Sequence, residues 1–168
     1  MILLHHTLDK NRERIIVNLL RKIPKEIRSY ARIPRHDLKE SLEYLFDAYI
    51  DLLVSKNSSN LKRLFRYIAK TRFAQSFPLS AILQALLSFS YELRLVLQDE
   101  FRKTSGDGRA LFNCAMELID KTTSESIFIF SDVYQNYVKS QIDDYNQYLN
   151  EQNQTLGIDL SKLILFRA

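Results

Sequence analysis

Glycine, proline and cysteine are scarce in this chain of 168 residues, and tryptophan is absent. With three glycines and three prolines, the sequence lacks the turn residues that a β-sandwich, a barrel or a doubly wound sheet needs at its many connections. The single cysteine, Cys114, excludes an intrachain disulfide and a four-cysteine zinc site, and it suits a reducing compartment. A chain of this length is expected to form one domain around one core. These scarcities favour an all-α, single-domain fold.

Long apolar runs are also missing. The runs at residues 15–17 and 163–166 are far shorter than the roughly 20 residues that cross a bilayer. The apolar start of the chain is followed at once by charged residues from Asp9 onward, which is not the pattern of a secretory signal peptide. We therefore expect no membrane span and a cytoplasmic location.

The charges are distributed unevenly along the chain. Residues 1–75 carry 16 basic and 8 acidic side chains, whereas residues 76–168 carry 8 basic and 12 acidic ones. This polarity either steers a nucleic acid to one face or lets the two halves attract each other, within a monomer or across a dimer. We favour the second interpretation.

Apolar residues recur at steps of three and four along most of the chain, which predicts a bundle of amphipathic helices. Pro24 should interrupt or bend the first helix, Asp37 is the expected N-cap of the second, and Ser59 or Asn60 that of the third. The fourth helix is apolar on more than one stripe and should be the central, most enclosed element. The predicted helices cover residues 15–30, 38–52, 61–75, 79–101 and 109–154, the last being either one helix or two joined near 121–124.

Two of the three glycines lie in residues 103–108, which form the clearest loop of the sequence. This loop lacks the Walker lysine and the dinucleotide glycine spacing, so a plain interhelical turn is favoured over a phosphate cradle. Gly157 separates a short amphipathic tail at 158–166. We expect a domain core over residues 12–150 and a C-terminal tail or linker over 151–168.

No recognisable catalytic or metal-binding motif is present in the sequence. The histidines are His5, His6 and His36, and each is expected on the surface, away from a nucleophile. Cys114 lies among apolar residues and is expected to pack as a small apolar side chain. The spacings typical of zinc and calcium ligands are missing. We therefore predict no enzymatic activity, no metal and no cofactor.

One stretch suggests a different class of function. The third predicted helix carries a cluster of basic residues interleaved with aromatic ones, and such a helix can hold phosphates and stack bases. The alternative is a solvated basic face opposite an apolar stripe, which we favour. The candidate nucleic-acid face consists of Lys62, Arg63, Arg66 and Lys70.

The last predicted helix carries a row of aromatic residues. Beyond Thr123 they fall on one side of the helix at a spacing near seven, with a glutamine between them, and this pattern suits a partner helix. The candidate dimer-interface residues are Phe130, Tyr134, Tyr137, Gln141, Tyr145 and Tyr148.

Three stretches resemble the amino-terminal domain of the RsbR-type regulators, the RsbT co-antagonist family of bacterial stress signalling. Residues 30–42 are similar to a tyrosine-containing linker that leads into a leucine-rich helix, and residues 64–79 to an arginine, a turn and an apolar-proline entry into the next helix. Residues 81–94 are similar to the helix that follows. Ser76 departs from the pattern, because the family often has glycine there, so the corner is expected to be shaped differently.

The resemblance covers roughly residues 12 to 150, and it implies a globin-like bundle without haem that dimerises through its terminal helices. It also implies an output module downstream, so the chain is either a free-standing version or part of a longer protein. The sequence agrees about haem, because no histidine follows His36. We thus predict a non-enzymatic sensory or regulatory domain that acts as a homodimer and binds a signalling partner or a small ligand. The signal and the partner are left open.

Overall fold

A computed structural model describes residues 2–102 and 108–155. Six α-helices and one short 3-10 helix make up this part of the chain, and it contains no strand, which confirms the predicted all-α class. The elements are α1 (Ile2–Lys10), α2 (Arg12–Glu26), η1 (Arg28–Arg32), α3 (Arg35–Ser55), α4 (Ser59–Ala74), α5 (Leu79–Arg102) and α6 (Gly108–Thr155).

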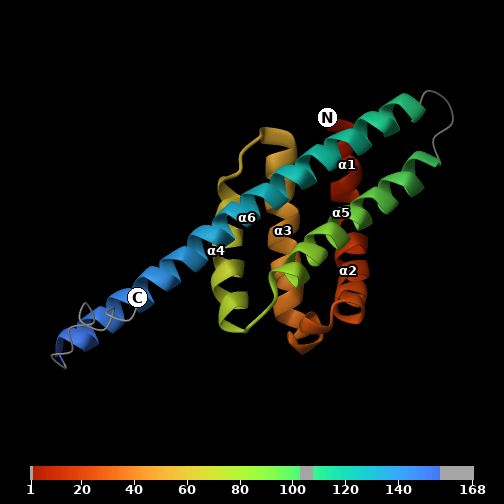
Figure 1. Ribbon diagram of the computed structural model, residues 1–168. Helices are drawn as coiled ribbons and strands as arrows, with labels where there is room; N and C mark the ends of the chain where they lie inside the picture. The colour runs from red at the N-terminus through yellow and green to blue at the C-terminus, as the bar shows by residue number, and fades with distance from the viewer. Residues whose placement is uncertain (1, 103–107, 156–168) are drawn as a thin grey trace, which may run out of the picture.

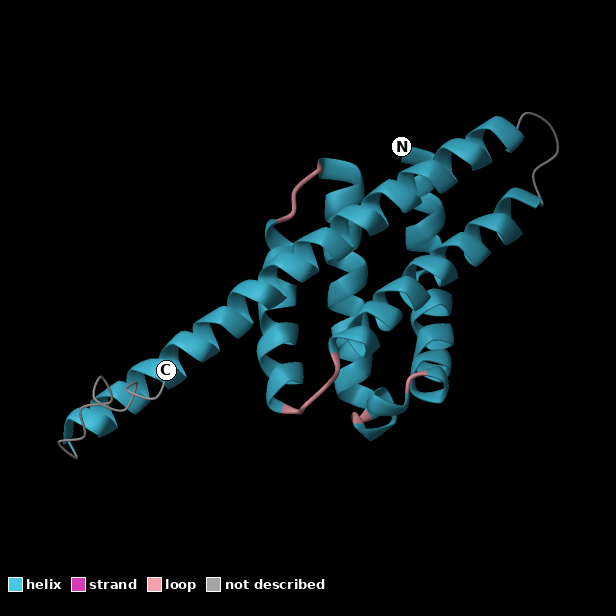
Figure 2. Ribbon diagram, in the orientation of Figure 1, coloured by secondary structure: helices cyan, strands magenta, loops and turns pink. Residues whose placement is uncertain are grey.

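The helices form two layers (Figures 1 and 2). Helices α2, α3 and α4 stand side by side in one layer, and α1 continues the direction of α2. Helices α5 and α6 run diagonally across them and pack against each other, with α5 over α1 and α2 and with α6 over α3 and α4. Beyond α4, α6 continues alone past the edge of the bundle.

One hydrophobic core lies between the two layers. The predicted apolar face of α3 is buried there, because residues at three- and four-residue steps share one side of a helix. The core begins earlier than residue 12, since Leu4 and Leu8 of α1 are both buried. The face of α3 consists of Leu38, Leu42, Leu45, Tyr49 and Leu52.

Several helix boundaries differ from those expected. Pro24 lies within the last turns of α2, which continues to Glu26. Helix α3 begins at Arg35, so Asp37 lies in its first turn and not at the N-cap. In the first turn its negative charge still interacts favourably with the positive end of the helix dipole. The side chain that supports the start of α4 is that of Asn57, whose Oδ1 accepts a hydrogen bond of 3.0 Å from the Ser59 N–H.

Helix α6 is a single helix of 48 residues, which resolves the two alternatives for this segment. Its polar stretch does not interrupt it, because the hydroxyl groups there donate to carbonyl oxygens one turn earlier. Thr123 donates to Ile119 at 2.7 Å, and Ser124 donates to Asp120 at 2.9 Å. The neighbouring loop at 103–107 and the tail from residue 156 lie outside the described residues.

Helix α5 is the one helix of the described chain that is long and apolar enough to cross a membrane. Half of its most apolar window is buried within the protein, so its composition is explained by the core. Leu87 and Tyr91 of α5 are exposed, so one side of this helix faces solvent. Cys114 of α6 is also exposed, so the expectation of an apolar, packed cysteine was wrong.

The corner before α5 places Ser76 in the left-handed region, with a φ of 56°. A side chain with a Cβ atom is strained there by about 1–2 kcal/mol, which glycine avoids at some entropic cost. Ser76→Gly is therefore expected to raise the free energy of unfolding by about 0.5–1 kcal/mol in urea titrations. The matched control is Ser140→Gly in the exposed part of α6, which should lower it by a similar amount. A loss of stability at Ser76 would contradict the strain argument.

Candidate functional site

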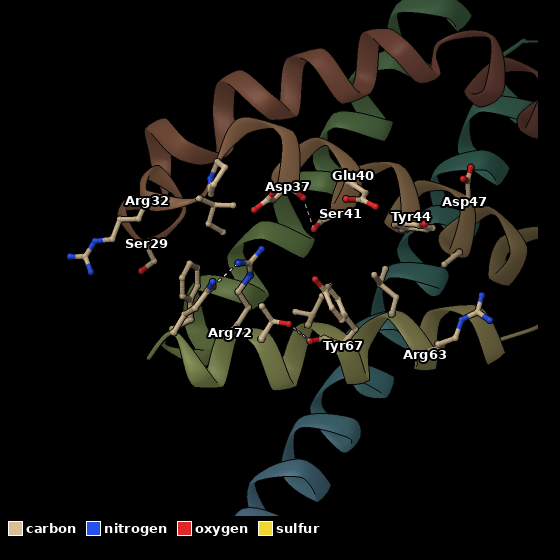
Figure 3. Close-up of a pocket in the computed structure, with 18 of the residues that line it drawn as sticks. Ser29, Arg32, Asp37, Glu40, Ser41, Tyr44, Asp47, Arg63, Tyr67 and Arg72 are labelled. Atoms are coloured by element: carbon tan, nitrogen blue, oxygen red, sulfur yellow. Dashed lines mark hydrogen bonds between the residues drawn. The ribbon is translucent and has the colours of Figure 1, made fainter.

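A cleft of about 1510 Å³ lies between α3 and α4 and ends at η1 (Figure 3). Two elements produce it. Helices α3 and α4 run antiparallel through a short connection, and side chains from both helices line the cleft. The half-buried side chains of Leu64 and Ile68 and the buried Ala48 give the cleft an apolar floor.

The two walls of the cleft carry opposite charges. Asp37 and Glu40 lie on the α3 wall, and Arg63 lies on the α4 wall (Figure 3). Two tyrosines face the same space from opposite walls, Tyr44 with 59% and Tyr67 with 63% of its surface exposed. Tyrosine rings are enriched at protein interfaces, so two of them facing one cleft are typical of a binding site.

Arg72 lies at the η1 end of the cleft and is only 6% exposed. Its guanidinium group lies 5.6 Å from the ring centre of Tyr30 and 5.1 Å from that of Phe77, and it donates a 2.7 Å hydrogen bond to Gln75 Oε1. Burial raises the pKa of Tyr30, and the nearby Arg72 partly counteracts that shift. No described carboxylate forms an ion pair with Arg72, so the cation is held by aromatic faces and an amide.

The far end of the cleft is held by polar contacts. Asn60 of α4 donates a 2.5 Å hydrogen bond to Asp51 of α3, and Arg63 donates a 3.1 Å bond to Asn60. Asp47 turns toward α2, where Arg12 binds it at 2.9 Å. The Asn60–Asp51 bond links α3 and α4, so this end of the cleft is preformed.

A buried hydroxyl network joins α3, α5 and α6 below the cleft. The Tyr49 hydroxyl contacts the carbonyl oxygen of Ile119 and the Thr123 hydroxyl, both at 3.0 Å, and Thr123 contacts the Ser90 hydroxyl at 2.7 Å. Burial is the main cause of a strongly raised Tyr49 pKa. This network connects the helix that forms one wall of the cleft with the long helix α6.

A family model matches most of the chain. The model of the RsbT co-antagonist protein rsbRD N-terminal domain matches residues 9–144, which is most of the chain. The chain belongs to this family. The resemblance inferred from residues 12–150 is thereby confirmed, and the rsbRD N-terminal domain is a regulatory domain of stress signalling. Comparisons with curated proteins and with solved structures found no match.

The structure divides the aromatic row of this rsbRD N-terminal domain into two parts. Phe130 is fully buried, and its ring lies 5.2 Å from that of Phe65 in α4, so it belongs to the chain's own core. Tyr134 lies 5.8 Å from Phe130, and Tyr137 lies 5.5 Å from Phe73. The remaining candidates lie beyond the bundle, with Gln141 half-buried and with Tyr145 and Tyr148 exposed.

The four candidate residues for a nucleic-acid face, Lys62, Arg63, Arg66 and Lys70, are all exposed on α4 of the rsbRD N-terminal domain. Arg72, which follows them in sequence, is buried instead. The carboxylates of α3 lie across the cleft from Arg63, so this surface is not uniformly basic. His5, His6 and His36 are exposed, and the described residues contain no group of three or more histidine, cysteine or acidic residues suited to a metal ion.

Tyr44 and Tyr67 were not among the site residues predicted from the sequence. Both residues could have been recognised from the sequence, because each places an aromatic ring on the polar side of an amphipathic helix. Their meeting across one cleft depends on how α3 and α4 pack, which the sequence of either helix does not contain.

Proposed function

We propose that this rsbRD N-terminal domain is a non-enzymatic module that works as a homodimer and passes a signal along α6. The observation that carries the proposal is the shape of α6, which packs in the bundle over its first part and then leaves it as one continuous helix (Figure 1). At 1.5 Å per residue, its 48 residues span roughly 70 Å. A rigid rod of this length can transmit a small displacement from the core to a distant surface.

A second apolar seam lies on the free part of α6. Val138, Ile142, Tyr145 and Leu149 follow one another at steps of four, three and four, which is the spacing of a coiled-coil seam. Val138 is half-buried and the other three are exposed. A single helix with such a stripe is stabilised when a second copy covers it. This seam is rotated by roughly a quarter turn from the side of Phe130, which packs against Phe65 of α4.

The proposed signal begins in the bundle. A ligand or partner that alters packing around α5 would act on Thr123 and its neighbours, because the hydroxyl network joins α5 and α6. The resulting shift would reach the dimer seam along α6 and from there any output module that follows. The family description names RsbT, and we propose a signalling protein of that kind as the partner.

Charging the seam is expected to separate the two copies. Ile142→Glu with Tyr145→Glu places like charges opposite each other in the paired helices, which is destabilising. We expect the dimer dissociation constant to rise at least tenfold in analytical ultracentrifugation, with the helical circular dichroism signal of the bundle retained. Tyr134 and Tyr137 are poorer targets, because glutamate there would also disturb the packing of Tyr134 on Phe130 and of Tyr137 on Phe73 of α4.

The matched control is Asn136→Glu with Ser140→Glu, which adds the same charge to exposed positions on the opposite side of α6. This variant should dimerise like the wild type. A wild-type protein that stays monomeric at high concentration, or an equal loss of dimer in both variants, would refute the seam.

A further inference from the structure

We propose that the α3–α4 cleft binds one amphipathic helix of a partner protein, oriented with its C-terminal end toward Arg72. The inference deepens the proposed function, on which it rests, by naming the surface that meets the partner. It uses none of the residues of the α6 seam.

The shape of the cleft suits a helix. Its long wall runs along α3 from Asp37 to Asp51, which at 1.5 Å per residue is roughly 21 Å, or four helical turns. The floor between the walls is apolar along Leu64 and Ile68. An apolar floor of this length between polar walls is the usual setting for helix-in-groove recognition.

The charges of the walls select the kind of partner. A helix lying on the floor turns one flank toward Asp37 and Glu40 of α3 and the other toward Arg63 of α4. The complementary helix is basic on one flank and acidic on the other. A nucleic acid or an anionic lipid surface would meet the α3 carboxylates, so the observations favour a polypeptide.

Two features give the site its anchors and its direction. The exposed rings of Tyr44 and Tyr67 supply large contact area at little cost in side-chain entropy. Arg72 is a buried cation with no ion-pair partner among the described carboxylates, and it lies at one end of the floor. The negative end of a helix dipole, or an acidic residue in the last turn, complements that charge.

The test uses three synthetic peptides of about four turns, each held helical by a crosslink on its outward face because short helices are marginal in water. All share the same apolar stripe. One has a basic and an acidic flank, one has two acidic flanks, and one has two basic flanks. Fluorescence anisotropy with the wild-type protein should show the mixed peptide binding at least tenfold more tightly than either of the others. Equal binding of all three, or preference for a same-sign peptide, would overturn the proposal.

Protein variants locate the binding. Glu40→Lys should shift the preference toward the doubly acidic peptide, and Arg63→Glu should shift it toward the doubly basic one. Tyr67→Ala should weaken the mixed peptide about tenfold. The control Lys62→Glu makes a comparable charge change on the outward face of α4 and should leave all three affinities unchanged. Unfolding midpoints confirm that each variant is folded.

Three further measurements separate the alternatives. The Ile142→Glu/Tyr145→Glu variant should bind the mixed peptide as the wild type does. The dimer proposal and the cleft proposal can therefore fail independently of each other. If Tyr67→Ala instead dissociates the dimer in ultracentrifugation, a second copy covers the cleft and the proposal is wrong.

A nitroxide at the peptide C-terminus should broaden the amide signals of Gln75 and Ser76. Broadening of the Asn60 signal instead would overturn the proposed orientation.

Discussion

Phe130→Ala is expected to lower the free energy of unfolding by about 3–5 kcal/mol. The Phe130 ring is fully buried between α6 and α4, with the ring of Phe65 at 5.2 Å and that of Tyr134 at 5.8 Å. Alanine removes the transfer free energy of the ring and leaves a cavity that the long, continuous α6 cannot easily close. Urea titration followed by circular dichroism at 222 nm measures the change.

The control lies two residues away. Phe128 is 77% exposed on the same helix, so Phe128→Ala makes the same chemical change without opening a cavity. Its effect should stay within about 0.5 kcal/mol of zero. Similar losses in both variants would show that the loss at Phe130 reflects helix propensity and not packing against α4.

The pair illustrates what the sequence can and cannot specify. Phe128 and Phe130 are indistinguishable by composition, and periodicity alone assigned Phe130 to an outward-facing row with Tyr134 and Tyr137. The period of an amphipathic helix shows that its apolar side has a partner, but it does not distinguish a neighbouring helix of the same chain from one of a second copy. The surroundings of the apolar side of α6 change along the helix: Phe130 packs against α4, whereas Tyr145 is exposed to solvent.

Helix existence was the easier part to predict. The apolar steps of three and four located α2, α3, α4 and α5 because each helix buries one stripe in the common core. Helix α1 was not predicted, since Leu4 and Leu8 are the only two buried apolar residues among its described side chains. The cleft was not predicted at all, because its walls are the polar sides of two helices, and polar sides carry no periodic signal of where they face each other.

Arg72 shows that the sequence pattern of basic residues does not reveal which of them are buried. It continues the basic run of Arg63, Arg66 and Lys70 in the sequence, yet it alone of these four is buried. It lies on the same side of α4 as Leu61 and Phe65, which is the side that faces the core. Its guanidinium group contacts the rings of Tyr30 and Phe77, which come from two other segments. Those rings come from segments that flank α3 and α4, so only the tertiary fold brings them to the guanidinium group.

Tyr49→Phe is expected to change how stability depends on pH. The buried Tyr49 hydroxyl contacts Ile119 and Thr123, so its removal at pH 8 should lower the free energy of unfolding by about 1–3 kcal/mol. Burial raises the pKa of Tyr49 in the folded protein well above the value of 10 that a solvated tyrosine has. The unfolded chain therefore releases this proton near pH 10 while the folded chain retains it.

It follows that wild-type stability should fall above pH 10, and the part due to Tyr49 should approach about 1.4 kcal/mol per pH unit. Tyr49→Phe has no such proton to lose, so the gap between it and the wild type should narrow steadily from pH 9 to pH 11.5 in urea titrations. Tyr145→Phe removes an exposed hydroxyl instead and should run parallel to the wild type. If wild type and Tyr49→Phe also ran parallel, the hydroxyl would not be ionising differently in the two states, and the burial of Tyr49 between α3 and α6 would be refuted.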